Sequence, residues 1–185
     1  MKLNMRPLHR TVYIALLAAL AMMCMLLFGV KLIPGAPYLK YDPSGGVLLL
    51  CGLLLGPAAG MECTVVKNVL YFLVHGGSPY GHLSDFIATA ALVFPAAFLA
   101  HRFQARGMRR VFCCAAGCLA SALLMIPANY VILHLQHGMS AEAVTASLVY
   151  IVPFNLLKTV LNSTVALLLH RPVWSALEKI LKIGE

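Results

Sequence analysis

Long apolar runs dominate the chain, and most of its charged residues lie in short segments between them. Of the 185 residues, 61% are apolar and 11% are charged, whereas soluble domains contain about 45–50% apolar and about 25% charged residues. A core of this size cannot hide so much apolar sequence from water. The pattern therefore excludes an ordinary soluble protein and predicts an all-α integral membrane protein, because helices satisfy their own backbone hydrogen bonds inside lipid.

The apolar runs predict six transmembrane helices in a single domain of residues 1–185. A helix that crosses a bilayer needs about 20 apolar residues. Two runs are shorter than that and are separated by Gly56-Pro57-Ala58-Ala59-Gly60, so they require shielding by neighbouring protein. We expect helices over residues 11–30, 45–56, 60–75, 82–100, 111–135 and 147–169.

The basic residues indicate the orientation of these helices. If the N-terminus is cytoplasmic, the outer segments contain only Lys31 and Lys40. The inner segments then contain Lys2, Arg6, Arg10, Arg102, Arg106, Arg109, Arg110, Arg171, Lys179 and Lys182. This asymmetry predicts that both termini are cytoplasmic. The net charge of +8 is thereby explained by topology and headgroup contacts, and nucleic-acid binding is not expected.

Amide and ammonium groups inside the last two expected helices suggest a ligand site. Asn155, Lys158 and Asn162 share one face of the helix at 147–169, and Asn129 lies in the preceding helix. Charged groups inside a membrane usually face a cavity or a partner. Amides that both donate and accept, together with one cation, suit a polyhydroxylated or heteroaromatic solute. We therefore favour Asn129, Asn155 and Lys158 as ligand-binding residues.

Other interpretations of the membrane-embedded polar residues remain open. Interhelical ion pairs would have Lys67 or Lys158 answering Asp85 or Glu62. An integral-membrane enzyme would use His82, Asp85, Glu62 and Lys67 as acid, base or metal ligands. No motif defines such a geometry, and His82 with Asp85 alone makes no metal site, so neither catalysis nor a bound metal is expected. A purely structural assembly protein is a third class, and it would bind no small molecule.

The first expected helix contains small residues at four-residue spacing. Ala15 and Ala19 lie on one face with little bulk, which allows another helix to approach closely. From the periodicity alone, packing inside the six-helix bundle is the favoured interpretation.

Four stretches together resemble a known family. They are Ala15-x-x-x-Ala19, the loop Pro37-Tyr38-Leu39-Lys40-Tyr41-Asp42-Pro43-Ser44, the run Leu55-Gly56-Pro57-Ala58-Ala59-Gly60 followed by Lys67-Asn68, and Val152-Pro153-Phe154-Asn155-Leu156-Leu157-Lys158. In these stretches the chain resembles the S components, or substrate-binding subunits, of energy-coupling-factor (ECF) vitamin transporters, and among them the riboflavin-specific group. The resemblance extends over about residues 11–171, nearly the whole chain.

The resemblance implies a six-helix subunit that captures riboflavin at the outer face of a prokaryotic plasma membrane and delivers it inward. It implies that Asn129, Asn155 and Lys158 hydrogen-bond the flavin, while the loop after the first helix closes over it. Tyr38, Leu39 and Tyr41 in that loop would cover the flat ring by stacking and apolar contact. Riboflavin is then the transported ligand, and no cofactor is expected.

The resemblance also implies partner proteins. In this family the small-residue face of the first helix, here Ala15 and Ala19, docks on a transmembrane coupling protein, which two cytoplasmic ATPases drive. This implication replaces internal packing as the expected role of the two alanines. It also supplies the energy source that the chain lacks, since the sequence contains no phosphate-binding loop of the Gly-x-x-x-x-Gly-Lys-[Ser/Thr] type.

One stretch departs from the family pattern. Riboflavin-specific members usually have Gly-Glu-x-x-Asn-Phe where this chain has Gly81-His82-Leu83-Ser84-Asp85-Phe86. If His82 and Asp85 contact the ligand, the substrate is a phosphorylated flavin, a flavin analogue, or another vitamin or nucleobase-like solute. If they are structural, the two positions have exchanged polarity, with an imidazole in place of the usual carboxylate and a carboxylate in place of the usual amide. Both interpretations stay open at this level.

Overall fold

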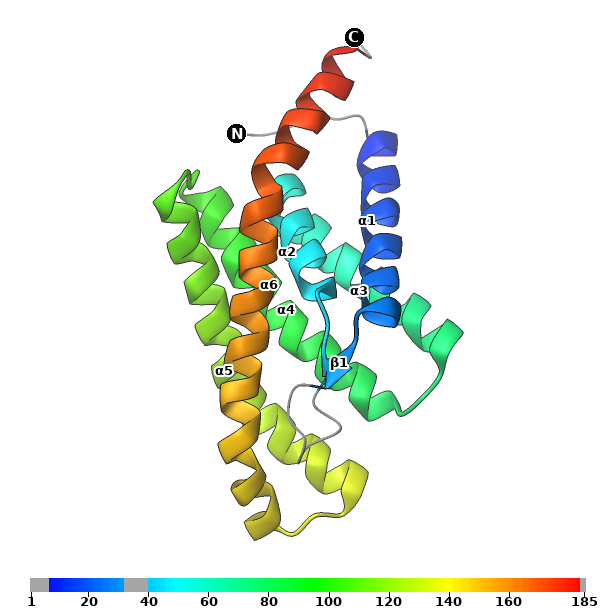
Figure 1. The fold of residues 1–185 in the computed structure, drawn as a ribbon, viewed down its shortest axis with the longest axis vertical. Helices are drawn as coiled ribbons and strands as arrows, with labels where there is room; N and C mark the ends of the chain where they lie inside the picture. Colours follow the sequence, from blue (N-terminus) through cyan, green and yellow to red (C-terminus); the bar gives the residue numbers. More distant parts are fainter. Residues whose placement is uncertain (1–6, 32–39, 184–185) are drawn as a thin grey trace.

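The computed structural model describes residues 7–31 and 40–183, which form a bundle of six helices (Figure 1). The helices are α1 Pro7–Leu27, α2 Ser44–Leu55, α3 Pro57–His75, α4 Pro79–Arg102, α5 Met108–His137 and α6 Ala141–Ile183. Between α1 and α2, β1 (Val30–Lys31) pairs antiparallel with β2 (Lys40–Tyr41). The all-α class and the number of helices are confirmed, and the short strand pair was not expected.

Helix α2 lies at the centre of the bundle. Every residue from Ser44 to Leu54 is buried, and the helix contacts α1, α3, α4 and α6. Because it has only 12 residues, it is too short to cross a bilayer alone. The expected shielding by neighbouring protein is therefore present around this short helix.

Helices α2 and α3 are joined at Gly56 and cross closely at a pair of glycines. Gly56 has a φ of +106°, a conformation that glycine adopts without strain, and Pro57 starts α3 at a position that tolerates proline. A Cβ on Gly60 would lie 2.8 Å from the Cα of Gly52 and 2.7 Å from Cγ1 of Val93 on α4. Because Gly60 and Gly52 have no side chain, α2, α3 and α4 can approach one another closely at this point.

The surface of the bundle carries large apolar side chains, as a lipid environment requires. Leu16, Leu123, Val149 and Leu168 are each more than 60% exposed. Among the described residues, α1, α4, α5 and α6 are long and apolar enough to cross a membrane, and α2 is a shorter apolar helix. The chain is thus a multi-pass membrane protein, while the prediction that all six helices span remains a prediction.

Several helices extend beyond their expected ends, and α6 does so by most. It covers Ala141–Ile183, 43 residues, where 147–169 was expected. Past the expected end, Leu177 is buried in the main core, and Val173 and Trp174 pack against that core. Tertiary packing therefore continues the helix through a segment in which Arg171 and Pro172 interrupt the apolar run.

The basic segments gather at one end of the bundle. Helix α1 begins, α6 ends and α4 turns into α5 at this end, whereas the β1–β2 pair and the turn from α5 to α6 lie toward the other (Figure 1). Arg10, Arg106 and Arg171 therefore belong to one end of the molecule. This arrangement agrees with the grouping of basic residues on the inner side in the predicted topology.

Candidate functional site

A buried network of two lysines and two carboxylates joins four parts of the chain. Nζ of Lys67 on α3 lies 2.6 Å from Oδ2 of Asp85 on α4, and Nζ of Lys158 on α6 lies 2.9 Å from Oδ1 of the same carboxylate. Nζ of Lys158 also lies 3.3 Å from Oδ2 of Asp42, just before α2. Asp85 is therefore the bridge between the two lysines.

The charges in this network balance while the groups are withdrawn from solvent. The side chain of Lys67 is 0% exposed, and those of Asp85 and Asp42 are 9% and 4% exposed. Buried charges are tolerated only when they are paired and hydrogen-bonded. Two ammonium groups against two carboxylates satisfy this requirement, so each group depends on its partners.

Asp42 connects the loop after β2 to α2 and α6. Its Oδ1 accepts hydrogen bonds from the backbone N–H of Ser44, at 3.0 Å, and from the Ser44 hydroxyl. The carboxylate therefore binds the first residue of α2 and, through its other oxygen, Lys158. Burial raises the pKa of the neighbouring Tyr41 phenol, and the Asp42 charge adds to this effect. Tyr41 is consequently a neutral side chain at physiological pH.

Asn129 on α5 and Asn155 on α6 each lie one turn from a shared apolar cluster. Leu133, one turn beyond Asn129, and Ile151, one turn before Asn155, belong to the same buried cluster, against which Tyr41 packs. Because α5 and α6 run in opposite directions, one turn from this cluster leads to Asn129 on one helix and to Asn155 on the other. Two buried amides therefore lie one turn from the cluster against which Tyr41 packs.

Both amides retain hydrogen-bonding capacity. Nδ2 of Asn129 donates to the carbonyl oxygen of Met125 at 2.7 Å, and its oxygen accepts no hydrogen bond from the described residues. The side chain of Asn155 forms no hydrogen bond with the described part of the chain, and only its backbone carbonyl accepts, from Thr159. Each amide therefore keeps donor or acceptor capacity that a ligand can use.

Three open cavities lie elsewhere in the described residues. Those of about 380, 400 and 440 Å³ are not lined by Asn129, Asn155 or Lys158. Tyr38 and Leu39, which were expected to cover the ligand, lie outside the described residues. Lys158, expected to donate to the ligand, is 13% exposed and already contacts two carboxylates.

His82 is separate from the ion-pair network although it lies one turn from Asp85. Its Nε2 donates to the carbonyl oxygen of Gly76 at 2.7 Å, beyond the end of α3. Its ring contacts those of Tyr71 and Phe72, with centroids 5.3 and 5.2 Å apart. His82 therefore stabilises the turn between α3 and α4, whereas Asp85 contacts the two lysines.

The residues of the alternative enzyme site do not converge. Glu62 pairs with Arg10 of α1, Oε1 to Nη2 at 2.8 Å, and both side chains are well exposed. His82 contacts the backbone of Gly76, and Lys67 contacts Asp85. Lys67 and Lys158 thus both form ion pairs with Asp85, and the interhelical ion pairs considered from the sequence are present.

Ala15 and Ala19 lie on the outer side of α1. Both are exposed, whereas Ile14, Ala18 and Ala21 form the buried face of this helix. The interpretation from periodicity alone, that Ala15 and Ala19 pack inside the bundle, is therefore not what the structure shows. A face of small residues is instead available to another helix.

Asp42 and Lys67 belong to the network but were absent from the site predicted from the sequence. Two lysines inside membrane helices need carboxylate partners, and Asp85 is one that lies inside an expected helix. Charge balance was therefore a signal for a second carboxylate, but it does not by itself separate Asp42 from Glu142. It would also have assigned Lys67 to Asp85.

Comparison with known proteins places this arrangement in a family. Residues 9–170 match the family described as the substrate-specific component of ECF transporters. The riboflavin transporter FmnP of Bacillus subtilis (strain 168) is 31% identical over 169 residues, which cover 84% of this chain and 87% of the relative. The riboflavin transporter RibU of Staphylococcus aureus (strain TCH60) is 30% identical over 188 residues, which cover 97% of each chain.

A solved structure shares the fold. It is described as the S component of a bacterial ECF transporter and superposes with a TM-score of 0.79 at 26% sequence identity, over 93% of this chain and 99% of that chain. The family match begins in α1 and ends in α6, so it includes all six helices and every residue of the ion-pair network. The chain therefore belongs to the family of substrate-specific components of ECF transporters.

Proposed function

We propose that this chain is the riboflavin-binding S component of an uptake transporter in a prokaryotic plasma membrane. It captures riboflavin at the outer face and delivers it inward without catalysis of its own. Two relatives named as riboflavin transporters align with most of the chain at about 30% identity, which supports this substrate. Riboflavin is the transported ligand and is not a cofactor.

The observation that carries the proposal is the pair of buried amides on α5 and α6. Asn129 and Asn155 are 7% and 6% exposed and lie next to the apolar cluster against which Tyr41 packs. The isoalloxazine ring of riboflavin is a flat apolar slab with imide groups at its edge. Each amide offers a donor and an acceptor to such an edge, and Tyr41 offers apolar and aromatic cover.

Lys158 and Asp85 act on the ligand in different ways under this proposal. Lys158 faces the same region as Asn155, one turn away on α6, and donates to a carbonyl or hydroxyl oxygen of the ligand. Asp85 positions the lysine through its ion pair. The hydrogen bond of His82 to Gly76 supports a structural role for this residue, so the His82/Asp85 departure is an exchange of polarity rather than a change of substrate.

The loop after α1 forms the outer cover. Asp42 anchors the end of this loop to Lys158, and Tyr41 packs against α5 and α6 beside it. Tyr38 and Leu39 contribute further cover. Both termini are cytoplasmic, which agrees with the gathering of basic residues at the opposite end of the bundle (Figure 1).

A transmembrane coupling protein docks on α1, and two cytoplasmic ATPases drive it. The exposure of Ala15 and Ala19 supports this docking face, since small residues allow close helix contact in a membrane.

Riboflavin binding by the purified chain tests the proposal. We expect quenching of flavin fluorescence on titration, and a weakening of about 5- to 150-fold for Asn155→Ala or Asn129→Ala, because a buried partner left without its hydrogen bond costs about 1–3 kcal/mol. Thr164→Ala is the matched control. Thr164 is an exposed polar residue of α6, and its hydroxyl donates to the carbonyl oxygen of Val160 in the same helix, so flavin affinity should not change.

The same titration separates riboflavin from the alternatives. Flavin mononucleotide, other vitamins and nucleobases are titrated in parallel. Tighter binding of one of these would transfer the S-component role to another solute, and absence of binding by all of them would contradict the proposal. Wild-type affinity in both Asn129→Ala and Asn155→Ala would remove these amides from the site.

A further inference from the structure

One of these cavities lies at the basic end of the bundle, far from the buried amides. It has a volume of about 380 Å³ and lies between the turn from α4 to α5 and the C-terminal part of α6. Arg110, in the first turn of α5, contributes to it, whereas Asn129 lies roughly 28 Å further along the same helix at 1.5 Å per residue. The cavity is therefore separate from the proposed flavin site.

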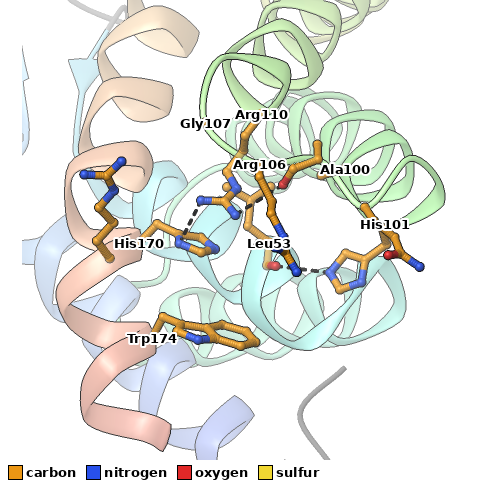
Figure 2. A pocket seen from close by; sticks show the side chains of 11 residues that line it. Leu53, Ala100, His101, Arg106, Gly107, Arg110, His170 and Trp174 are labelled. Atoms are coloured by element: carbon orange, nitrogen blue, oxygen red, sulfur yellow. Dashed lines mark hydrogen bonds between the residues drawn. The ribbon is translucent and has the colours of Figure 1, made fainter. Parts of the chain in front are cut away.

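Positive side chains enter this cavity from the turn. Figure 2 shows Arg106 and Arg110 projecting into the space between His170 and His101. Nη1 of Arg110 donates to Nδ1 of His170 at 3.0 Å, and Nη2 donates to the carbonyl oxygen of Ala105 at 3.3 Å. Because a guanidinium group can only donate, Nδ1 of His170 is the acceptor. His170 is therefore neutral, with its proton on Nε2, and adds a donor.

No carboxylate balances these arginines within the described part of the chain. The ion pairs there involve Lys67, Lys158 and Arg10, and no aspartate or glutamate lines the cavity. Arg110 uses two of its five N–H donors within the protein. The cavity thus offers uncompensated positive charge and donors in a fork arrangement that matches phosphate oxygens.

The other walls are apolar and aromatic. Leu53 and Trp174 line the cavity, and the ring of Trp174 stacks on His170 with centroids 6.0 Å apart and an interplanar angle of 3°. Tryptophan and arginine at the end of membrane helices are typical of the boundary between lipid and water. Basic pockets between helices at the cytoplasmic boundary bind the headgroups of anionic lipids.

We propose that this cavity binds the phosphate group of an anionic phospholipid in the inner leaflet. Arg106 and Arg110 bind the phosphate oxygens, and the wall formed by Leu53 and Trp174 contacts the apolar part of the lipid. A soluble phosphate ester shares the phosphate chemistry but has no acyl chains.

Retention of defined lipids by the full-length protein tests the proposal. The chain is purified in detergent, mixed with phosphatidylglycerol or phosphatidylcholine, and weighed by native mass spectrometry. We expect the wild type to retain phosphatidylglycerol preferentially and Arg106→Gln/Arg110→Gln to lose this preference by about 30-fold, since each guanidinium that binds the headgroup in the cavity contributes about fivefold. Arg102→Gln/Arg109→Gln removes the same charge from exposed side chains outside this cavity and should retain it.

Two further measurements make the result decisive. Arg106→Gln alone changes an exposed side chain, so it lowers retention about fivefold without disturbing the contacts of Arg110. Calorimetric titration with glycerol 3-phosphate tests the soluble source. Binding of this ester without selective retention of phosphatidylglycerol would overturn the lipid assignment. Equal retention by the wild type, the cavity variants and the control would overturn the site itself.

Discussion

Replacement of Asp85 by asparagine should destabilise the protein by about 3–5 kcal/mol, the usual cost of removing one member of a buried ion pair. Asp85 makes two of the three contacts in the network, at 2.6 Å to Lys67 and 2.9 Å to Lys158. Asparagine has nearly the same shape but no charge. The substitution therefore removes electrostatic compensation while leaving the packing almost unchanged.

The cost should arise mainly at Lys67. Its side chain is 0% exposed, and Asp85 is its carboxylate partner in the described part of the chain, so Asp85→Asn leaves a buried ammonium group uncompensated. Lys158 keeps Asp42 at 3.3 Å. The double variant Lys67→Met/Asp85→Asn should consequently be more stable than Asp85→Asn alone, because methionine fills a similar volume and requires no partner.

The free energy of unfolding measures this effect. Denaturant titration in detergent micelles can follow the fluorescence of Trp174, the single tryptophan of the chain, which lies outside the network. Glu62→Gln is the matched control, since it also converts a carboxylate to an amide in an ion pair. That pair is 39% and 49% exposed, so its loss should cost no more than about 1 kcal/mol.

Two results would refute this reasoning. A cost for Asp85→Asn no greater than that for Glu62→Gln would mean that burial does not make this pair important. A double variant as unstable as the sum of the two single changes would mean that the two groups do not compensate one another.

Two further substitutions test other features. Ala15→Trp/Ala19→Trp should leave riboflavin binding unchanged and reduce riboflavin uptake in cells at least tenfold by blocking the coupling protein. Leu20→Trp, also exposed on α1 but on a different face of the helix, should not reduce uptake. Loss of binding, or normal uptake, in the double variant would contradict the docking role. Gly60→Ala should lower the free energy of unfolding by about 1–3 kcal/mol because its Cβ would overlap α2 and α4. Gly81→Ala, with open space around it, should be neutral or stabilising. Equal effects of the two substitutions would contradict the close crossing.

The sequence predicts the helices well because the membrane imposes one strong rule. An apolar run must form a helix in lipid, so the run from 111 to 135 lies within α5, Met108–His137. The end of α6 was not predictable in this way. Trp174 and Leu177 continue it by packing on the core, and such contacts depend on the positions of other helices.

The site was predictable where helical spacing decides it and not where long-range contacts do. That Asn155 and Lys158 share one face was predictable because they are three residues apart in a helix. Asp42 was missed because its importance comes from Lys158, which lies far away in sequence. The separation of His82 from Asp85 was equally hidden, since it depends on the carbonyl group of Gly76 rather than on spacing.

The central position of α2 has a consequence for how the protein is made. A 12-residue helix is a poor substrate for insertion by itself, because it is shorter than the bilayer core. Its contacts with α6 form only after the ribosome has translated the last helix. Assembly in the membrane must therefore finish late, with α2 held by α1, α3 and α4 until the C-terminal helix encloses it. Truncation before α6 should yield a nascent chain that membrane quality control degrades.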